Sequence, residues 1–359
     1  MAIFHVLGAD IPHHNKTLLT FFNEVLATEV PSTQARKFIV VTQDIGFAEQ
    51  FPNLSIHCVT SKKHVAQVIL DLAKNRQTVF FCHGQFNPYL WLALLSGRIR
   101  RHQLHWHIWG ADLYEASQSL KFKLFYLLRR RAQRRVAAVY ATLGDLSVYK
   151  QKNPKVAGHK LYFPTKMATT QQKGGSEDTN RPLTLLLGNS GDPANRHCQA
   201  LTQIAQRFGD EVTVIIPMGY PENNQEYIAK VSSHASQLFV AGQVEIITEK
   251  LTFEAYLKVV DRCQLGYFIF ARQQGVGTLS LLIDKNIPFV ISRKNPFWRD
   301  LAAQQLPVLF DEDSLDREII QRARQQLVHH DKTTIEFFSP GYLQGWRETL
   351  QRLEGMELS

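Results

Sequence analysis

The sequence predicts an α/β protein with two domains, each a parallel sheet that carries helices on both faces. Short apolar runs alternate with helix-like stretches through both halves of the 359-residue chain, as in doubly wound sheets. A polar, Gly- and Ser-rich segment, residues 167–182, lies between the halves and is interpreted as a linker. In residues 265–298, a strand, a glycine turn, a helix and another strand follow one another without a break.

The first domain is expected to span residues 1–166 and the second residues 183–335. Strands are predicted in the first domain at residues 3–8, 37–42, 78–84, 105–110 and 136–142, and helices at 16–28, 62–75, 88–96 and 118–135. Strands are predicted in the second at residues 183–188, 211–217, 244–248, 265–270, 287–291 and 306–310, with helices near 195–207, 223–238 and 252–261. Residues 336–359 are predicted to form a helix that could cross back to the first domain.

The composition indicates a protein without structural disulfides or a membrane span. Hydrophobic residues make up 44% of the chain, which is enough for a large core. The four cysteines show neither a CxxC pair nor a zinc-type histidine spacing, as expected for reduced thiols in a cytosolic protein. No apolar run approaches the ~18 residues that span a bilayer, and the N-terminus does not read as a secretory signal. We therefore expect a protein that is soluble or lies on a membrane surface.

The net charge of +9 is concentrated in one segment. Residues 98–135 contain ten Lys or Arg against two acidic residues, a balance of +8. Such a segment predicts a polyanionic partner, either nucleic acid or an anionic lipid surface, and its apolar LKFKLFYLL run could insert into a membrane. A core helix that favours Arg in its last turns through the helix dipole is the alternative. The candidate membrane-facing residues are Lys121, Lys123, Arg129, Arg130, Arg131, Arg134 and Arg135.

The turn after residue 270 predicts an anion site. Gly275-x-Gly277-Thr278 precedes a helix expected to begin near Thr278, so free backbone N–H groups and the positive helix end would face the strand edge. The spacing is neither a G-x-G-x-x-G fingerprint nor a P-loop, so we interpret it as a diphosphate site of another kind, or as a turn that only packs helix on strand. GNSGD, residues 188–192, is a second amide-rich turn at the same edge. The candidate residues are Gly188, Asn189, Ser190, Gly191, Tyr220, Gln273, Gln274, Gly275, Gly277 and Thr278.

Two doubly wound domains are expected to face a cleft, with ligands at the carboxyl ends of the strands. The candidate residues at this edge of the first domain are Asp10, His13, His14, His83, Asn87, Trp109 and Asp112. Trp109 could stack on a sugar or simply pack beside its strand. His83 and Asn87 are suited to hydrogen bonding with a sugar.

Two carboxylates and one arginine are the catalytic candidates. Asp112 could act as a general base or grip a substrate hydroxyl, with helix capping as the alternative, and Asp10 is a second candidate with the same alternative. Arg272 could neutralise a departing diphosphate, or could be an ordinary exposed arginine. We expect no metal, since the acidic run 311–313 fits the start of a helix.

Several motifs carry a family resemblance: VLGADIPHHN, CHGQFNP, HWHIWGADLYE, LLGNSGD, IPMGYP, YFIFARQQGVGTL and FFSPGYLQGW. Over about residues 3–350 the chain resembles the TDP-N-acetylfucosamine:lipid II N-acetylfucosaminyltransferases of enterobacterial common antigen synthesis. The resemblance implies the GT-B fold, two Rossmann-like domains facing a cleft. It also implies transfer of 4-acetamido-4,6-dideoxy-D-galactose (Fuc4NAc) from TDP-Fuc4NAc to an undecaprenyl-diphosphate-linked disaccharide of N-acetylmannosaminuronate and N-acetylglucosamine.

The resemblance assigns roles to the candidates of both domains. The second-domain turns would bind the TDP-sugar donor, and His13, His14, His83, Asn87 and Trp109 would bind the lipid-linked acceptor. It further implies a peripheral position on the cytoplasmic face of the inner membrane, against an anionic surface, with no nucleic acid partner and no cofactor.

One position departs from the broader GT-B pattern. Many such enzymes carry a ribose-binding Glu five residues before the Gly of a G-x-P turn, and here that position is Leu281. Another group must then hold the ribose. A two-domain nucleotide-sugar epimerase and a non-enzymatic binder of anionic polymer remain as alternative functions.

Overall fold

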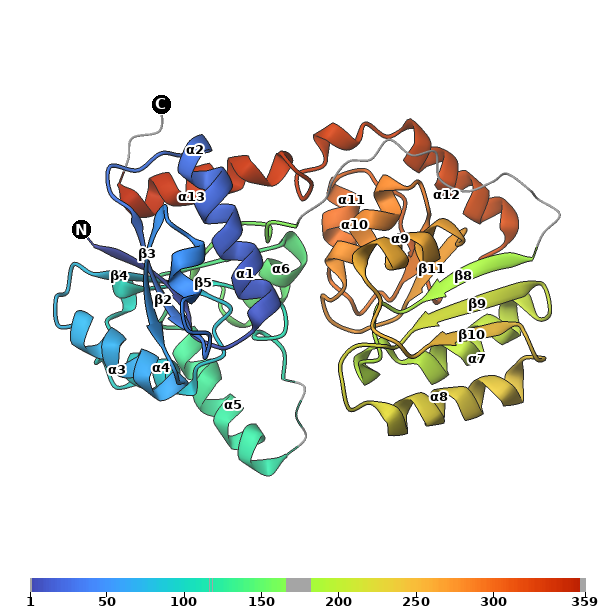
Figure 1. Cartoon of the computed structure of the whole chain (residues 1–359), viewed down its shortest axis with the longest axis horizontal. Coiled ribbons are helices and arrows are strands. Elements are labelled where there is room, and N and C mark those ends of the chain that lie inside the picture. The colour runs from blue at the N-terminus through green and yellow to red at the C-terminus, as the bar shows by residue number, and fades with distance from the viewer. Residues whose placement is uncertain (1, 116, 118, 166–181, 356–359) are drawn as a thin grey trace. The chain divides into compact units, whose positions relative to one another are not determined.

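The computed structural model describes residues 2–115, 117, 119–165 and 182–355 (Figure 1). The chain divides into two compact units, residues 1–166 with 336–359 and residues 167–335. Each unit is an α/β layer structure around one parallel sheet, so the predicted fold class is confirmed. The expected linker, residues 167–182, lies outside the described residues except for residue 182.

The first unit is built on a seven-stranded parallel sheet with the order β3-β2-β1-β4-β5-β6-β7. Its strands are β1 (Ile3–Leu7), β2 (Arg36–Val41), β3 (Leu54–Val59), β4 (Val79–His83), β5 (Leu104–His107), β6 (Ala138–Ala141) and β7 (Ala157–Lys160). The first six strands have the order of doubly wound nucleotide-binding folds. Strands β3 and β7 are not among the predicted strands, because both are edge strands whose side chains are largely exposed and so lack a continuous apolar run.

Helices cover both faces of this sheet (Figure 1). They are α1 (Pro12–Thr20), α2 (Ala27–Glu29), α3 (Lys62–Leu72), α4 (Pro88–Leu95), α5 (Leu120–Gln133), α6 (Leu143–Lys152) and α13 (Gly341–Glu354), with the π-helical turn η1 (Phe21–Leu26) and the 3-10 turns η2 (Phe47–Gln50) and η3 (Arg101–Gln103). On one face, Val65 of α3 and Trp91 of α4 pack in one cluster with Trp106 of β5. On the other face, Phe22 of η1 and Trp346 of α13 lie against the ring of His83.

The C-terminal helix α13 is part of the first unit. Trp346 is fully buried there, and its indole N–H donates to the carbonyl of Tyr162 at 3.0 Å. Near the end of α13, Glu354 accepts from Arg36 of β2 at 2.8 Å in a largely buried ion pair. The chain therefore begins and ends in the same unit.

The second unit repeats the same plan with six parallel strands in the order β10-β9-β8-β11-β12-β13. The strands are β8 (Leu183–Leu187), β9 (Val212–Pro217), β10 (Val244–Ile247), β11 (Leu265–Phe268), β12 (Phe289–Ile291) and β13 (Leu309–Phe310). The helices are α7 (His197–Phe208), α8 (Gln225–Leu238), α9 (Phe253–Asp261), α10 (Val276–Asp284), α11 (Trp298–Ala303) and α12 (Arg317–His329), with the 3-10 turns η4 (Pro193–Asn195) and η5 (Lys332–Thr334).

The position of α10 depends on a glycine in β11. A Cβ at Gly266 would lie 2.8 Å from a side-chain carbon of Leu282, so a larger residue would push α10 off the sheet. On the opposite face, α7 and α8 pack on the sheet through Leu201, Ile204 and Val231. The strands of each sheet are all parallel, so the turns that follow them gather at one edge, where such folds bind ligands.

Candidate functional site

The turn after β8 is shaped by buried side chains that the sequence analysis did not single out. Asn195 accepts from the backbone N–H of Asn189 at 3.1 Å and donates to the carbonyl of Ser190 at 3.1 Å. Gly191 donates its N–H to the carbonyl of Tyr220 at 2.6 Å, and a Cβ on it would lie 2.0 Å from the amide nitrogen of Asn224. The turn is therefore held rigidly against the segment that follows β9.

Beneath the same turn lies His197, the first residue of α7. It is fully buried, and its Nδ1 lies 3.1 Å from the hydroxyl of Tyr227. Burial lowers the pKa of His197 to about 4, with the charge of Asp192 opposing the shift. The ring is therefore neutral at neutral pH, and it supports the turn without placing a charge under it.

The turn before α10 meets the turn after β8. Gly275 adopts φ +66° and ends the turn, and a Cβ on it would lie 3.1 Å from the amide nitrogen of Asn189. No side chain caps α10, and within the described residues the N–H groups of residues 276–278 have no hydrogen-bond partner. Space around Gly277 is open, since a Cβ there would meet nothing within 4 Å. The helix therefore presents free donors at an accessible edge.

Polar groups without partners gather around these two turns. The side-chain oxygens of Asn189 and Gln274 are buried and accept no hydrogen bond within the described part of the chain. Arg272 is half-buried and has no carboxylate or other polar partner among the described residues. A guanidinium without a counterion and free backbone donors in one short segment favour a bound anion. A diphosphate is the ligand that the sequence predicts for these turns.

Two exposed aromatic side chains lie at the same edge, after β9 and β10. Tyr220 is 64% exposed, and Phe253, the first residue of α9, is 60% exposed. Their segments touch, because a Cβ on Gly219 would lie 2.0 Å from the carbonyl oxygen of Glu249. Tyr220 is among the residues predicted for this site and Phe253 is not; the available signal was an aromatic residue directly after the capping residue Thr252.

In the first unit, Asp112 is not available to a substrate. It is 1% exposed, and its carboxylate accepts from the backbone N–H groups of Gln85 and Trp109, both at 2.8 Å, and from the indole of Trp106 at 2.6 Å. Burial raises its pKa while these hydrogen bonds oppose the shift. Asp112 joins the loops after β4 and β5, so its assignment as a general base or hydroxyl-gripping residue is wrong for this geometry.

His83 and Asn87 are also turned inward, which corrects their assignment to acceptor binding. Both are buried. Asn87 caps α4 by accepting from the N–H of Tyr89 at 3.0 Å, and it donates to the carbonyl of Lys62 at 2.7 Å. His83 lies between His5 and His107 in a chain of buried imidazoles.

Asp10, by contrast, is exposed at the end of β1 and has no hydrogen-bond or ion-pair partner within the described residues. It lines a cavity of about 250 Å³ together with Asn15, Thr42 and Asp44.

His13, His14 and Trp109 lie at the same edge as Asp10. The rings of His14 and Trp109 stack with centroids 5.4 Å apart, and both pack against Phe163. The indole N–H of Trp109 is buried and has no partner in the part of the chain that the structure describes. His13 is exposed, with its ring edge against His14.

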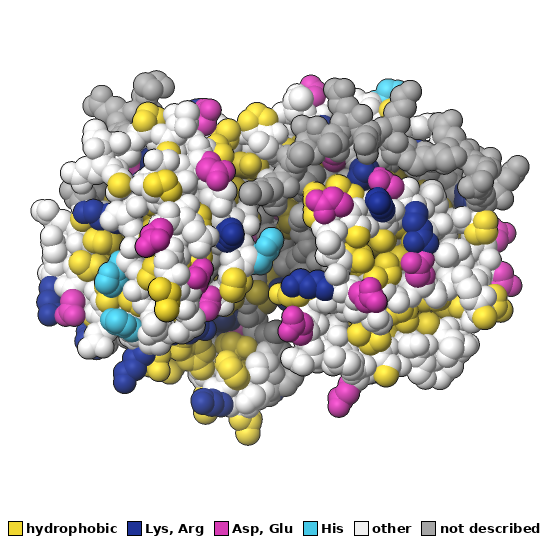
Figure 2. Space-filling view, viewed as in Figure 1, with side chains coloured by type: hydrophobic (Ala, Val, Ile, Leu, Met, Phe, Trp, Pro, Cys, Tyr) yellow, Lys and Arg dark blue, Asp and Glu magenta, His cyan; other side chains and the backbone are white. Residues whose placement is uncertain are grey.

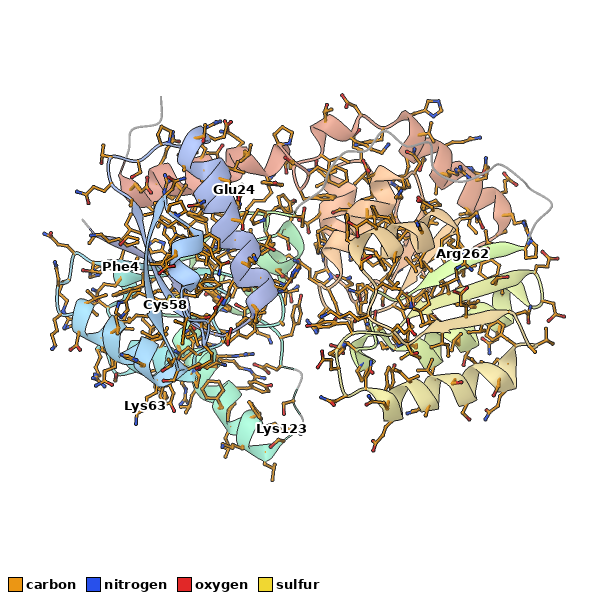
Figure 3. The ribbon with its side chains drawn as sticks, viewed as in Figure 1. Phe4, Glu24, Cys58, Lys63, Lys123 and Arg262 are labelled. Carbon is orange, nitrogen blue, oxygen red and sulfur yellow. The ribbon has the colours of Figure 1, made fainter. Side chains whose placement is uncertain are left out.

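Helix α5 carries an exposed surface that is both basic and apolar (Figure 2). Lys123 points away from the helix into solvent (Figure 3). The exposed basic residues are Lys121, Lys123, Arg130, Arg131, Arg134 and Arg135. The exposed apolar residues are Leu120, Phe122, Leu124, Leu127 and Leu128, and Tyr89 and Leu92 are exposed on the neighbouring α4. We call these residues together the α5 surface.

Arg129 does not belong to the α5 surface, which corrects its prediction as membrane-facing. It is 7% exposed, and its guanidinium donates to the carbonyls of Asp112, Leu113 and Tyr114 at 3.1–3.2 Å. It also lies over the ring of Tyr126. Arg129 therefore holds the loop after β5 onto α5. No helix in the described ranges has the length and apolarity that a membrane span requires.

Two doubly wound α/β units are the architecture of the GT-B class of glycosyltransferases, to which the chain's fold corresponds. The family model described as 4-alpha-L-fucosyltransferase, glycosyl transferase group 56, matches residues 1–355. The chain therefore belongs to this family and is a hexosyltransferase. Family membership excludes the epimerase and the non-enzymatic binder that the sequence left open.

Solved structures support the fold. The Anabaena protein HepE, in complex with UDP and glucose, superposes with a TM-score of 0.66 at 10% identity, over 99% of this chain and 100% of that one. A glycosyltransferase from Rickettsia africae gives 0.63 at 9% identity, over 99% of both chains. The trehalose-6-phosphate synthase OtsA gives 0.60 at 8% identity, over 100% of both chains. At these identities the likeness concerns the fold alone.

Proposed function

We propose that the protein transfers Fuc4NAc from TDP-Fuc4NAc to the undecaprenyl-diphosphate-linked ManNAcA-GlcNAc disaccharide, lipid II. The observation that carries the donor half of this proposal is the pair of touching turns before α7 and α10. These turns combine free N–H groups, a guanidinium without a counterion and open space at Gly277. A nucleoside diphosphate is the leaving group that this combination fits. The structure of HepE with UDP and glucose supports a nucleotide sugar as the donor.

In this proposal the donor lies along the carboxyl edge of the second sheet. The diphosphate accepts from the N–H groups of residues 276–278, and Arg272 balances the charge that grows as the sugar leaves. Tyr220 and Phe253 are the exposed rings against which the base would stack.

The acceptor is assigned to the first unit, at the end of β1. Because Asp112 is buried and fully bonded, Asp10 replaces it as the carboxylate that orients the acceptor hydroxyl. The bond between the anomeric carbon and the diphosphate oxygen breaks, and the acceptor oxygen forms the new bond to that carbon. For transfer with retained configuration, the acceptor proton passes to the leaving diphosphate, so no side-chain base is indispensable.

We further propose that the α5 surface binds the anionic face of the inner membrane, on the cytoplasmic side, where a lipid-linked acceptor is found. Basic side chains beside exposed Leu and Phe on one helix combine electrostatic attraction with apolar insertion. Surface charges lose this attraction as salt rises. We therefore expect the protein to bind anionic vesicles, and we expect this binding to weaken but not to disappear at high ionic strength.

Vesicle cosedimentation tests the membrane proposal. The double change Arg131→Glu with Arg134→Glu should release the protein from anionic vesicles. The double change Lys230→Glu with Lys258→Glu makes the same change in net charge on exposed helices of the second unit and should leave binding intact. Equal loss in both variants, or equal binding of the parent to neutral and anionic vesicles, would contradict docking through α5.

Transfer itself is tested with purified protein, TDP-Fuc4NAc and the lipid-linked disaccharide, with the product followed by mass spectrometry. The expected product is the acceptor plus one Fuc4NAc residue. Omitting the N-acetylmannosaminuronate unit from the acceptor should abolish transfer. Transfer from a different nucleotide sugar, with none from TDP-Fuc4NAc, would overturn the substrate assignment and leave the hexosyltransferase class standing.

A further inference from the structure

A cavity of about 610 Å³ opens at the amino edge of the first sheet. Its lining comes from the start of β4, the start of β5 and the last turn of α13, all of which belong to the first unit. The lining residues include Arg76, Val79, His102, His105, Arg352 and Leu353. We call this hollow the amino-edge cavity. Its volume is in the range of sites that hold small organic ligands.

The amino-edge cavity is separate from the acceptor site assigned to the end of β1. Strand β4 begins at the cavity, whereas Asp10 and Trp109 follow the carboxyl ends of β1 and β5. At about 3.3 Å per residue, a strand as long as β4 keeps the two edges of the sheet roughly 13 Å apart. A ligand in the cavity would therefore not compete with the acceptor.

The lining carries positive charge without a compensating carboxylate. Arg76 and Arg352 are both exposed, and apart from one hydrogen bond of Arg76 to a loop carbonyl, neither guanidinium has a partner within the described residues. Glu354, two residues beyond Arg352, is already paired with Arg36. The carboxyl end of α13 contributes about half a negative charge, so the cavity keeps about +1.5 when its histidines are counted as neutral.

Hydrogen bonds hold the polar lining in place. Arg76 donates to the carbonyl of Arg98 at 3.1 Å, and the carbonyl of Arg76 accepts from Nε2 of His102 at 2.8 Å. Nδ1 of His105 lies 3.3 Å from the hydroxyl of Tyr140. Chiefly burial lowers the pKa of His105 to about 4, so this ring is a neutral hydrogen-bonding group at pH 7. The cavity therefore combines two free cations with oriented imidazoles.

An organic phosphomonoester fits both the charge and the size of the cavity. A phosphomonoester carries about −1.5 to −2 at pH 7, whereas a carboxylate or a phosphodiester carries about −1. Guanidinium groups match the geometry of phosphate oxygens. Val79 and Leu353 add apolar lining that inorganic phosphate would leave without a contact.

We propose that the amino-edge cavity is a second anion site, which binds the phosphomonoester of a small organic molecule or of a lipid headgroup. Arg76 and Arg352 hold the phosphate oxygens. Arg98, Arg100 and Arg101 are exposed in the segment that leads to β5 and lie outside the α5 surface, and their charge draws a dianion toward this edge. The site does not depend on the transfer reaction proposed above.

Histidine side-chain NMR of the full chain reports on the cavity directly, because His102 and His105 line it. Glycerol 3-phosphate is the soluble probe, and glycerate presents a carboxylate on the same carbon skeleton. Glycerol 3-phosphate should shift the signals of both histidines and bind at least about 10-fold more tightly than glycerate. Equal affinity for glycerol 3-phosphate and inorganic phosphate would overturn the proposed class of ligand.

Two variants separate a specific site from general attraction. Arg352→Gln should weaken the binding of glycerol 3-phosphate by about 10- to 100-fold, because it removes a charge-assisted contact. Arg101→Gln removes the same charge from an exposed neighbour of His102 outside the cavity and should weaken binding by less than about threefold. Equal weakening in the two variants would contradict a site in the cavity.

Vesicle cosedimentation distinguishes the two sources of the phosphomonoester. If the source is a lipid, vesicles with phosphatidate should bind the parent and Arg101→Gln more tightly than vesicles of equal charge with phosphatidylglycerol, and Arg352→Gln should lose this preference. No preference for phosphatidate, together with histidine shifts by glycerol 3-phosphate, would assign the site to a soluble phosphomonoester. No preference and no histidine shifts would overturn the proposal and leave the proposed function standing.

Discussion

Lowering the pH from 7 to 5.5 is predicted to remove about 4 kcal/mol from the free energy of unfolding of the first unit, through three buried histidines. Nδ1 of His5 lies 3.0 Å from Nε2 of His83, and Nδ1 of His83 lies 3.3 Å from Nδ1 of His107. All three are buried beneath aromatic side chains that include Phe22 and Trp346. Among the residues that the structure describes, no carboxylate hydrogen-bonds or ion-pairs with any of the three rings.

Burial lowers the pKa of His5 and His107 to about 3, and the charge of Arg36 adds to the effect at His5. The pKa of His83 is also lowered well below 6.5, first by burial and then by the charges of its two histidine neighbours. Because the folded-state pKa values lie below the unfolded value, the unfolded chain binds more protons in acid. The stabilisation is complete above about pH 6.5 and is lost as the pH falls from there toward 3.

The magnitude follows from proton linkage. A histidine with an unfolded pKa near 6.5 that stays neutral in the folded protein lowers the free energy of unfolding by about 1.3 kcal/mol between pH 7 and pH 5.5. Three such groups lower the free energy of unfolding by about 4 kcal/mol. This is a large share of the roughly 5–15 kcal/mol by which a typical domain is stable. His105, whose pKa is lowered to about 4 chiefly by burial, acts in the same direction.

Urea unfolding followed by tryptophan fluorescence measures this loss, since four of the five tryptophans lie in the first unit. His107→Phe removes one titrating group and should reduce the loss between pH 7 and 5.5 by about a third, whatever it does to the absolute stability. His57→Phe, at an exposed position on β3, is the matched control and should leave the loss unchanged. A pH-independent free energy of unfolding in the parent, or an equal loss in parent and His107→Phe, would refute the reasoning.

The remaining predictions concern the candidate site. Asp112→Asn should destabilise the protein by about 2–3 kcal/mol in urea unfolding, because an amide NH₂ would face N–H donors. A stability close to that of the parent would show that Asp112 does not hold the loops after β4 and β5 together. Asp10→Asn should leave stability within about 0.5 kcal/mol but lower turnover with the lipid acceptor in a steady-state assay; unchanged kinetics would remove Asp10 from the site. Arg272→Ala should lower kcat by about 10²-fold, and the first-formed product should be the α-anomer by NMR; a β product, or a far smaller loss, would contradict the retaining mechanism. Gly191→Ala should lower the melting temperature, because its Cβ would collide with Asn224, and an unchanged melting temperature would show that the turn is not rigid.

The buried strands and the two glycine turns before α7 and α10 could be predicted from the sequence, because each depends on local patterns. Apolar runs such as residues 183–187 and 265–268 are buried strands, and glycines at 188 and 275 adopt positive φ where the chain turns into a helix. The edge strand β3 escaped prediction because its exposed side chains give no such run.

The direction of side chains at the strand ends could not be predicted in the same way. Polar residues at the carboxyl edge serve two purposes in this fold: some face the ligand, and others satisfy the backbone of the loops that shape the site. Asp10 and Asp112 both lie a few residues after a strand, yet only Asp10 is exposed. Arg129 is likewise buried, because its guanidinium donates hydrogen bonds to three loop carbonyls. Such pairings depend on tertiary contacts between segments far apart in the sequence.

The most direct test of the account is calorimetric titration of TDP into the parent protein and into Gly277→Val. A valine at position 277 has open space in the unliganded protein, so the melting temperature should stay close to that of the parent, although the side chain would block the approach of a diphosphate to the N–H groups of α10. We expect measurable TDP binding to the parent and none to the variant. Equal TDP affinity in the two proteins would contradict the placement of the donor on α10.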